Sequence, residues 1–220
     1  MRFASHPEGS WIMIYENVKQ LYNFILNNPI KKVLDLGCGI GCSASIIALA
    51  LKDKGETDYH IDSIEQFDKC IKLANEIIPE ELKKNITIHK SEVEIWQTDM
   101  IPYEYFSNYK TIPGWDYDFI LNDGPAPFRE KQNLIELPNG TIHKALIENN
   151  LKPKTIIACD GRIISLKLLE RYFGYNFYLI SPAQGPGGDF NVLERKDTPF
   201  KFEDMKLKSM EGSTYFGEKH

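Results

Sequence analysis

The stretch Val33-Leu34-Asp35-Leu36-Gly37-Cys38-Gly39-Ile40-Gly41 joins a short apolar segment to a run of small and apolar residues through a turn with three glycines. Residues 32–36 predict a buried β-strand, and residues 43–51 predict a helix. Glycine lets a chain that leaves a strand turn sharply, and it lets a ligand approach the backbone before the helix begins. The stretch therefore predicts a strand, turn and helix unit with a nucleoside-type ligand at the turn.

Strand and helix patterns continue to alternate on both sides of this unit. The pattern predicts an amphipathic helix at about residues 11–28, a core at about residues 30–195 and a charged tail after Lys196. Further strands are expected at residues 59–64, 86–89, 117–121, 155–159, 175–180 and 190–194, and further helices at residues 67–78, 142–149 and 163–173. This alternation predicts a three-layer α/β fold with a doubly wound, mostly parallel seven-stranded sheet and an antiparallel C-terminal strand.

Two long connections interrupt the alternation. Residues 92–116 are rich in Trp, Tyr and Phe, and residues 124–141 include the run Arg129-Glu130-Lys131. Long loops in compact domains often carry function, so both connections are expected as loops near the binding site.

Size and composition indicate one domain over residues 1–220, because 220 residues with 42% apolar side chains can form one core. No apolar run approaches the roughly 20 residues that span a bilayer, so no membrane partner and a cytoplasmic location are expected. The net charge of −5 is mild and the lysines are scattered among acids, which disfavours a nucleic-acid partner. A homodimer is an assembly compatible with these features.

The spacing of the glycines separates two kinds of nucleotide cofactor. A dinucleotide-binding turn has the spacing G-x-G-x-x-G, and Cys42 takes the place of its third glycine because Gly41 comes one residue too early. The form D-x-G-x-G-x-G, from Asp35 to Gly41, resembles motif I of class I S-adenosylmethionine-dependent methyltransferases. The resemblance implies a Rossmann-like fold over roughly residues 30–195 and S-adenosylmethionine as cofactor. A purely structural glycine turn and an NAD-dependent oxidoreductase remain the alternatives.

The resemblance also implies which residues bind the cofactor. In that family an acid at the end of the second strand binds both ribose hydroxyls, and Glu65 matches it, with Asp62 as the alternative. A polar residue after the third strand meets the adenine amino group, and Ser91 and Glu92 occupy that stretch. The expected cofactor-binding residues are Asp35, Gly37, Cys38, Gly39, Gly41, Glu65, Gln66, Ser91, Glu92 and Asn122.

Asp123 and Asp160 each follow an apolar strand, and open parallel sheets bind ligands at the carboxyl ends of their strands. Asp123 could act as general base toward the methyl acceptor, or both acids could hold Mg²⁺. Metal-dependent O-methyltransferases of this class commonly follow the second acid with Asn. Here Gly161 and Arg162 follow, and Arg162 could instead pair with Asp160. A plain turn before Gly124-Pro125 is the structural alternative for Asp123.

His143 is a second candidate for the catalytic base. It lies just after the second long connection, and histidine titrates near neutral pH. A lone histidine is more often structural than catalytic, and that alternative stays open.

The methyl acceptor is expected to be a small molecule or a sugar, methylated at oxygen. Methyltransferases that act on base amino groups resemble one another in a D/N-P-P-Y/F stretch after the fourth strand, and Asn122-Asp123-Gly124-Pro125 does not match it. The alternatives are a non-catalytic module that binds S-adenosylmethionine, and a methyltransferase acting on protein or nucleic acid.

Overall fold

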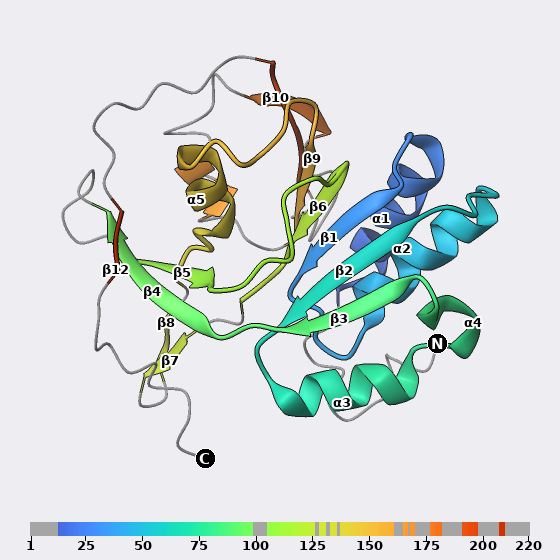
Figure 1. Cartoon of the computed structure of the whole chain (residues 1–220), viewed down its shortest axis with the longest axis horizontal. Coiled ribbons are helices and arrows are strands. Elements are labelled where there is room, and N and C mark those ends of the chain that lie inside the picture. The colour runs from blue at the N-terminus through green and yellow to red at the C-terminus, as the bar shows by residue number, and fades with distance from the viewer. Residues whose placement is uncertain are drawn as a thin grey trace.

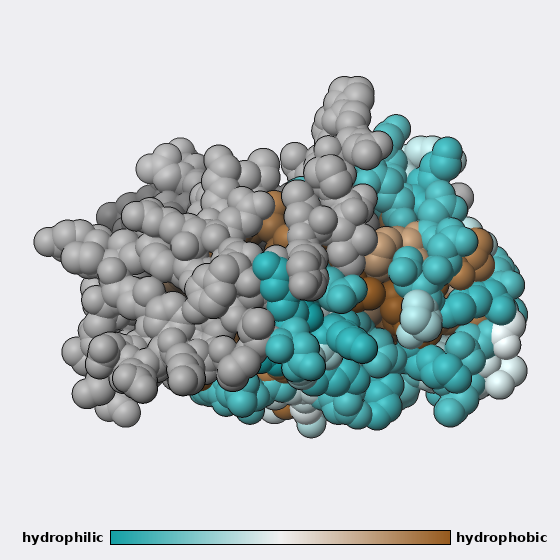
Figure 2. Space-filling view, turned by 90° about the horizontal axis from the view of Figure 1, so that it is seen from above, coloured by the Kyte–Doolittle hydropathy of each residue, from teal (hydrophilic) through white to brown (hydrophobic). Residues whose placement is uncertain are grey.

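The structure is a computed structural model, and it describes residues 13–98, 105–125, 128–130, 133–135, 137–160, 165–166, 168–169, 177–181, 191–197 and 207–209. Within these ranges no helix has the length and apolar character needed to cross a membrane. Figure 2 shows one face of the molecule, on which the described residues are mostly hydrophilic with small apolar areas between them.

The main sheet has seven strands in the order β10-β11-β9-β6-β1-β2-β3. The strands β3, β2, β1, β6 and β9 pair in parallel, and β11 runs antiparallel to both β9 and β10. This arrangement confirms the predicted doubly wound α/β fold with an antiparallel C-terminal strand. The strands span Lys32–Leu36 (β1), His60–Glu65 (β2), Ile86–Lys90 (β3), Phe119–Asn122 (β6), Ile156–Cys159 (β9), Phe177–Ser181 (β10) and Asn191–Arg195 (β11).

Helices cover both faces of the main sheet (Figure 1). The helices are α1 (Tyr15–Asn27), α2 (Cys42–Asp53), α3 (Asp68–Ile77), α4 (Glu80–Lys83) and α5 (Thr141–Ile147). Side chains of α1 and α2, such as Leu21 and Ile47, share one core with Val33 of β1. Leu34, the next residue of β1, belongs to a second core with Ile142 of α5. Because strand side chains alternate between faces, this split places β1 between two helical layers.

Short strands correct the two connections that were expected to be loops. Residues 92–116 contain β4 (Val93–Thr98) and β5 (Tyr105–Tyr109), and residues 124–141 contain the hairpin of β7 (Phe128–Glu130) and β8 (Asn133–Ile135). In the charged tail, β12 (Leu207–Ser209) pairs with β4, so that β12, β4 and β5 form a second sheet. No local turn signal announces these pairings, which explains why the sequence pattern missed them.

The ends of the predicted elements need smaller corrections. Helix α1 begins at Tyr15, and the two residues before it, Met13 and Ile14, are not helical. The predicted start at residue 11 lies outside the described residues. Of the predicted helix at 163–173, residues 165–166 and 168–169 are helical, and the others lie outside the described part of the chain.

The order of the strands locates the edge where ligands bind. Strand β1 lies between β2 and β6, so the chain leaves β1 toward one side of the sheet and leaves β6 toward the other. In open α/β sheets the crevice outside the carboxyl ends at such a switch point is the usual ligand site. In Figure 1, β1 and β2 run toward the second sheet, which therefore flanks this edge.

Candidate functional site

The first turn of the glycine loop is fixed by backbone contacts. The N–H groups of Gly37 and Cys38 both donate to the carbonyl oxygen of Ile64, at 3.1 and 3.0 Å. Gly37 has φ +103°, and a Cβ atom there would lie 2.7 Å from the backbone nitrogen of Gly124. Only glycine tolerates both conditions, so the loop after β1 lies directly against the chain after β6.

The other two glycines of the motif differ in their surroundings. Gly41 has φ +89°, and a Cβ atom there would lie 2.7 Å from Cγ1 of Ile78. Gly39 has φ +52°, and a Cβ atom there would meet nothing within 4 Å. Packing and backbone conformation thus require Gly41, whereas Gly39 faces space that a ligand could occupy.

Asp35 is a buried acid with one unsatisfied oxygen. The hydroxyls of Ser43 and Ser63 donate to its Oδ2 at 2.8 and 3.0 Å, whereas Oδ1 is buried without a hydrogen-bond partner. Burial raises the pKa of Asp35 to about 6, against the lowering effect of the two hydroxyls. Oδ1 of Asp35 therefore keeps the capacity to accept a hydrogen bond from a ligand.

Glu65, at the end of β2, reaches across to the glycine loop. Its Oε2 accepts the N–H of Gly39 at 2.7 Å, and its Oε1 accepts the N–H groups of Gln66 and Phe67 at 2.8 and 3.0 Å. Burial raises the pKa of Glu65, and these three hydrogen bonds oppose that rise. A carboxylate oxygen can accept two hydrogen bonds, so Oε2 retains capacity for a ligand hydroxyl.

Asp62, the alternative ribose acid, lies elsewhere. It sits in the middle of β2 and faces the opposite side of the sheet from Glu65, since side chains alternate along a strand. Its carboxylate accepts the hydroxyl of Tyr117 at 2.9 Å and lies 2.6 Å from Nε2 of His89. Glu65 is therefore the acid at the glycine loop.

The two candidates for adenine recognition face different surroundings. The backbone N–H of Ser91 donates to the carbonyl of Glu65 at 3.0 Å, and its buried hydroxyl accepts the N–H of Thr111 at 2.9 Å. The carboxylate of Glu92 is 73% exposed and pairs with Lys110 at 2.7 Å. Ser91 thus lies beside Glu65, whereas Glu92 is directed to solvent.

Asp123 and Asp160 directly follow the last residues of two adjacent strands, β6 and β9. Asn122 pairs with Cys159 where β6 and β9 lie in parallel, so the next residues, Asp123 and Asp160, continue side by side. The N–H of Asp123 donates to the carbonyl of Leu36 at 2.9 Å, which ties it to the end of β1. The register therefore brings both predicted acids to the carboxyl edge.

Asn139 is a site residue that the sequence analysis did not identify. Its side-chain nitrogen donates to Oδ1 of Asn122 and to the carbonyl of Gly124, and its Oδ1 accepts the N–H of Thr141 at 2.8 Å. Asn139 is 2% exposed and stands just before α5. It thus holds the chain around Asp123 in place. The pair Asn139-Gly140 before a helical pattern was a turn signal that could have indicated it.

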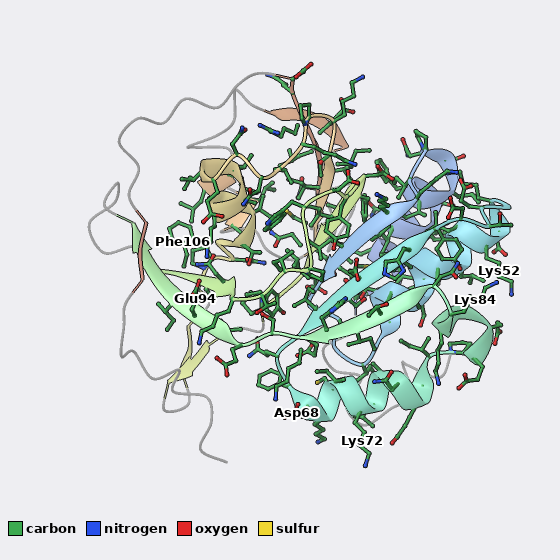
Figure 3. The ribbon with its side chains drawn as sticks, in the orientation of Figure 1. Lys52, Asp68, Lys72, Lys84, Glu94 and Phe106 are labelled. Carbon is green, nitrogen blue, oxygen red and sulfur yellow. The ribbon has the colours of Figure 1, made fainter. Side chains whose placement is uncertain are left out.

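His143 lies in an apolar environment. It is 4% exposed, its ring centroid lies 5.1 Å from that of Phe106, and burial lowers its pKa to about 4. Figure 3 labels Phe106 and Glu94 on the second sheet, next to α5, and Glu94 pairs with Lys144 of α5 at 3.3 Å. His143 therefore helps to join α5 to the second sheet, and it is neutral at neutral pH.

Among the side chains that the structure describes, no three His, Cys, Asp or Glu residues are grouped so that they could hold a metal ion. Arg162, the predicted ion-pair partner of Asp160, lies outside the described residues. That ion pair stays a prediction.

The comparisons with known proteins concern the fold. No protein-family model matches the sequence, and no curated protein sequence matches it. The structure is similar to that of TomG, an O-methyltransferase from Streptomyces achromogenes solved with S-adenosylmethionine, with a TM-score of 0.56, 12% identity and coverage of 89% of this chain and 85% of that one. The fold is the Rossmann-like fold of class I methyltransferases.

Two further solved methyltransferase structures are similar to this one. A putative O-methyltransferase from Klebsiella pneumoniae has a TM-score of 0.55 and 14% identity, with 85% of this chain and 83% of that chain covered. A precorrin-6y C5,15-methyltransferase from Geobacter metallireducens has a TM-score of 0.53 and 12% identity, with 85% and 91% covered. The names of these neighbours indicate different methyl acceptors on one fold.

The site fits a ligand with hydroxyl groups and a cationic amine. In this methyltransferase fold, Glu65 has acceptor capacity beside the glycine loop, Asp35 has an unsatisfied oxygen, and Gly39 faces open space. Hydroxyl and ammonium groups are the donors that carboxylates bind best. The arrangement can therefore hold a nucleoside with an amino-acid end.

Proposed function

We propose that this protein is an S-adenosylmethionine-dependent methyltransferase that methylates an oxygen of a small molecule or sugar. The observation that carries the proposal is the contact of Glu65 with Gly39, which joins the ribose acid to the glycine loop at 2.7 Å. When bound, S-adenosylmethionine supplies the activated methyl group.

Two acids provide polar partners for the ribose and for the ammonium group of the cofactor. Glu65 accepts the ribose hydroxyls through Oε2, while its bonds to the N–H groups of Gln66 and Phe67 keep the carboxylate in place. Asp35 accepts the ammonium group through Oδ1, and Ser43 and Ser63 hold its other oxygen. A nearby positive charge favours the ionised form of Asp35, which offsets the burial of this acid.

Asp123 is the residue that we assign to the methyl acceptor. It follows β6 directly, and Asn139 fixes the backbone around it through Asn122 and Gly124. Asp123 orients the acceptor hydroxyl and takes its proton on the carboxylate during transfer. We do not assign this role to His143, because His143 is buried against Phe106.

The arrangement favours this cofactor over a dinucleotide. A dinucleotide fingerprint uses its third glycine to bring the strand and the helix close together, and Cys42 occupies that position as the first residue of α2. S-adenosylmethionine has no pyrophosphate that must lie on the N-terminus of this helix.

Calorimetric titration with S-adenosylmethionine and with its demethylated product S-adenosylhomocysteine tests the proposal. We expect micromolar binding by the wild type and a loss in Glu65→Ala, with chelator present in one series and magnesium in another. Glu76→Ala on the exposed side of α3 is the matched control, and it should bind as the wild type does. Absence of binding to correctly folded wild type would refute the proposal. Binding would justify a screen of hydroxyl-bearing acceptors.

A further inference from the structure

A tyrosine of the second sheet reaches the place where the glycine loop contacts the chain after β6. Tyr109 is the last residue of β5, and in Figure 1 the arrow of β5 points toward the main sheet. A Cβ atom placed on Gly124 would collide with the hydroxyl oxygen of Tyr109 and would lie 2.6 Å from the Cα atom of Gly37. The hydroxyl of Tyr109 and the backbone of Gly37 therefore both lie against Gly124.

The backbone and the ring of Tyr109 hold this hydroxyl in place. Tyr109 pairs with Val93 of β4, and its backbone N–H donates to Oγ1 of Thr141 at 3.2 Å. The residue is 2% exposed and belongs to the core that also contains Leu36 of β1 and Ile64 of β2. Because strand pairing and close packing both fix the ring, the hydroxyl has little freedom to leave Gly124.

The proposed cofactor contacts place the reacting centre beside the same residues. In the proposed function, Glu65 binds the ribose and Asp35 binds the ammonium group. The sulfur of the cofactor is bonded to the ribose on one side and to the amino-acid chain on the other, so it lies between these two acids. Its methyl group is then directed toward Asp123, which directly precedes Gly124. The methyl sulfonium therefore lies near the contact between Gly37 and Gly124.

We propose that Tyr109 is a further residue of the active site, whose hydroxyl oxygen contacts the methyl sulfonium of bound S-adenosylmethionine. The sulfur is positively charged and polarises the C–H bonds of its methyl group, so an oxygen lone pair attracts both. A phenol hydroxyl supplies such an oxygen without a charge that burial would penalise. The inference deepens the proposed methyl transfer and rests on it for the cofactor.

The contact would act on the direction of the methyl group. The positive charge of the sulfonium disappears during transfer, so attraction to that charge alone would not accelerate the step. An oxygen that holds the methyl group in one direction favours the in-line approach of the acceptor. S-adenosylhomocysteine lacks both the methyl group and the charge, so Tyr109 should favour binding of the cofactor over binding of the product.

The ratio of the affinities for cofactor and product tests the contact without a methyl acceptor. Tyr109→Phe keeps the ring in the core and removes only the oxygen. We expect this variant to bind S-adenosylmethionine about two- to fivefold more weakly in calorimetry and S-adenosylhomocysteine as the wild type does. Tyr117→Phe is the matched control, because Tyr117 belongs to the same core and its hydroxyl donates to Asp62, away from the glycine loop. It should leave the ratio unchanged.

Sinefungin, an analogue with an ammonium group in place of the methyl sulfonium, should give a larger effect. An ammonium group donates a full hydrogen bond to a hydroxyl oxygen, so Tyr109→Phe should weaken sinefungin binding about tenfold or more. A tyrosine with only a structural role would weaken all three ligands by the same factor. The spread among the three ligands therefore separates a contact with the cofactor from a general loss of packing.

A measurement on the wild type covers the case in which Tyr109→Phe does not fold. S-adenosylmethionine labelled with ¹³C in its methyl group is bound to the protein, and nuclear Overhauser effects from the methyl protons are recorded. We expect a cross-peak to the ring protons of Tyr109, because these protons lie next to the hydroxyl on the ring.

Three results would each overturn the inference. They are equal weakening of all three ligands in Tyr109→Phe, unchanged binding of all three, and a methyl group without a cross-peak to the ring of Tyr109. If the wild type binds the three ligands and one of these results is found, the proposed methyltransferase function stands and only the role of Tyr109 is removed. If folded wild type binds none of the ligands, the proposed function fails, and the inference fails with it.

Discussion

Oε2 of Glu65 accepts a hydrogen bond of 2.7 Å from the backbone N–H of Gly39, which stands 26 positions earlier in the chain. This contact connects the end of β2 to the middle of the glycine loop. One carboxylate therefore holds the loop in shape and remains able to accept ribose hydroxyls. Changes on either side of the contact should affect cofactor affinity more than they affect folding.

Alanine at Gly39 should lower cofactor affinity, because its Cβ atom would enter the open space over the loop. The positive φ of +52° should cost about 1–2 kcal/mol of folding free energy. Gly55→Ala is a matched control, since Gly55 has φ +83° and equally open surroundings after α2. Denaturant unfolding should give similar losses for both variants, and calorimetry should show weaker S-adenosylhomocysteine binding for Gly39→Ala alone. Equal binding by both would contradict the assigned role of the loop.

Alanine at Gly37 should act mainly on the fold. Its Cβ atom would lie 2.7 Å from the backbone of Gly124, and backbone atoms cannot move aside as a flexible side chain can. Strain at φ +103° adds to this clash, so a loss of about 3 kcal/mol or more is expected. Denaturant unfolding measures the loss. A Gly37→Ala variant as stable as Gly39→Ala would disprove the close approach of the two loops.

Cofactor binding should release a proton near pH 6 through Asp35. Burial raises the pKa of Asp35 to about 6, and the arriving ammonium group favours the ionised form. Affinity for S-adenosylhomocysteine should therefore rise between pH 5 and pH 7. Calorimetry in buffers of different ionisation enthalpy measures the released proton. The release should be absent in Asp35→Asn, and a release that persists in this variant would exclude Asp35 as its source.

The same acid should make stability depend on pH. The pKa of Asp35 is about 6 in the folded chain, above its ordinary value of 3.8. The contribution of Asp35 to the free energy of unfolding is therefore complete below pH 4, and it is lost as pH rises through 6. The loss amounts to about 3 kcal/mol. Urea unfolding of the ligand-free protein at several pH values should show this component in the wild type and not in Asp35→Asn.

His143 should produce the opposite dependence in the same pH range. Burial lowers its pKa from 6.5 to about 4, so its contribution is complete above pH 6.5 and is lost as pH falls through 4. The loss is about 3 kcal/mol, and His143→Gln should remove it. Urea unfolding of His143→Gln against wild type between pH 4 and pH 7 measures the difference. If His143→Gln instead abolished methyl transfer while it bound S-adenosylhomocysteine normally, His143 would be the catalytic base.

Removal of the Asn139 side chain should destabilise the chain around Asp123. Asn139→Ala leaves the side chain of Asn122 and the carbonyl of Gly124 with fewer partners in a buried region. Each unsatisfied group costs about 1–3 kcal/mol, so a loss of about 2–4 kcal/mol is expected. Asn75→Ala, at an exposed position of α3, should change stability little. A small effect of Asn139→Ala in denaturant unfolding would show that the backbone holds this segment without it.

The sequence by itself determined the succession of the main-sheet strands along the chain and the place of the glycine loop. Both depend on local patterns. Each of these patterns is contained within a few residues. They are the apolar run of β1, the acid at the end of β2, and the spacing of Gly37, Gly39 and Gly41. Alternation of such units leaves few possible topologies, so the doubly wound sheet and its antiparallel β11 could be predicted.

Only the tertiary structure decided what the long connections and the distant side chains do. The pairing of β12 with β4 and the contact of Asn17 with Asp160 join residues more than a hundred positions apart. No periodicity or turn signal records such a pairing, because its free energy comes from a partner strand or a burial that exists only in the folded chain. For the same reason, the sequence placed Asp123 and Asp160 at strand ends, and only the packing of α1 in the folded chain brought Asn17 to Asp160.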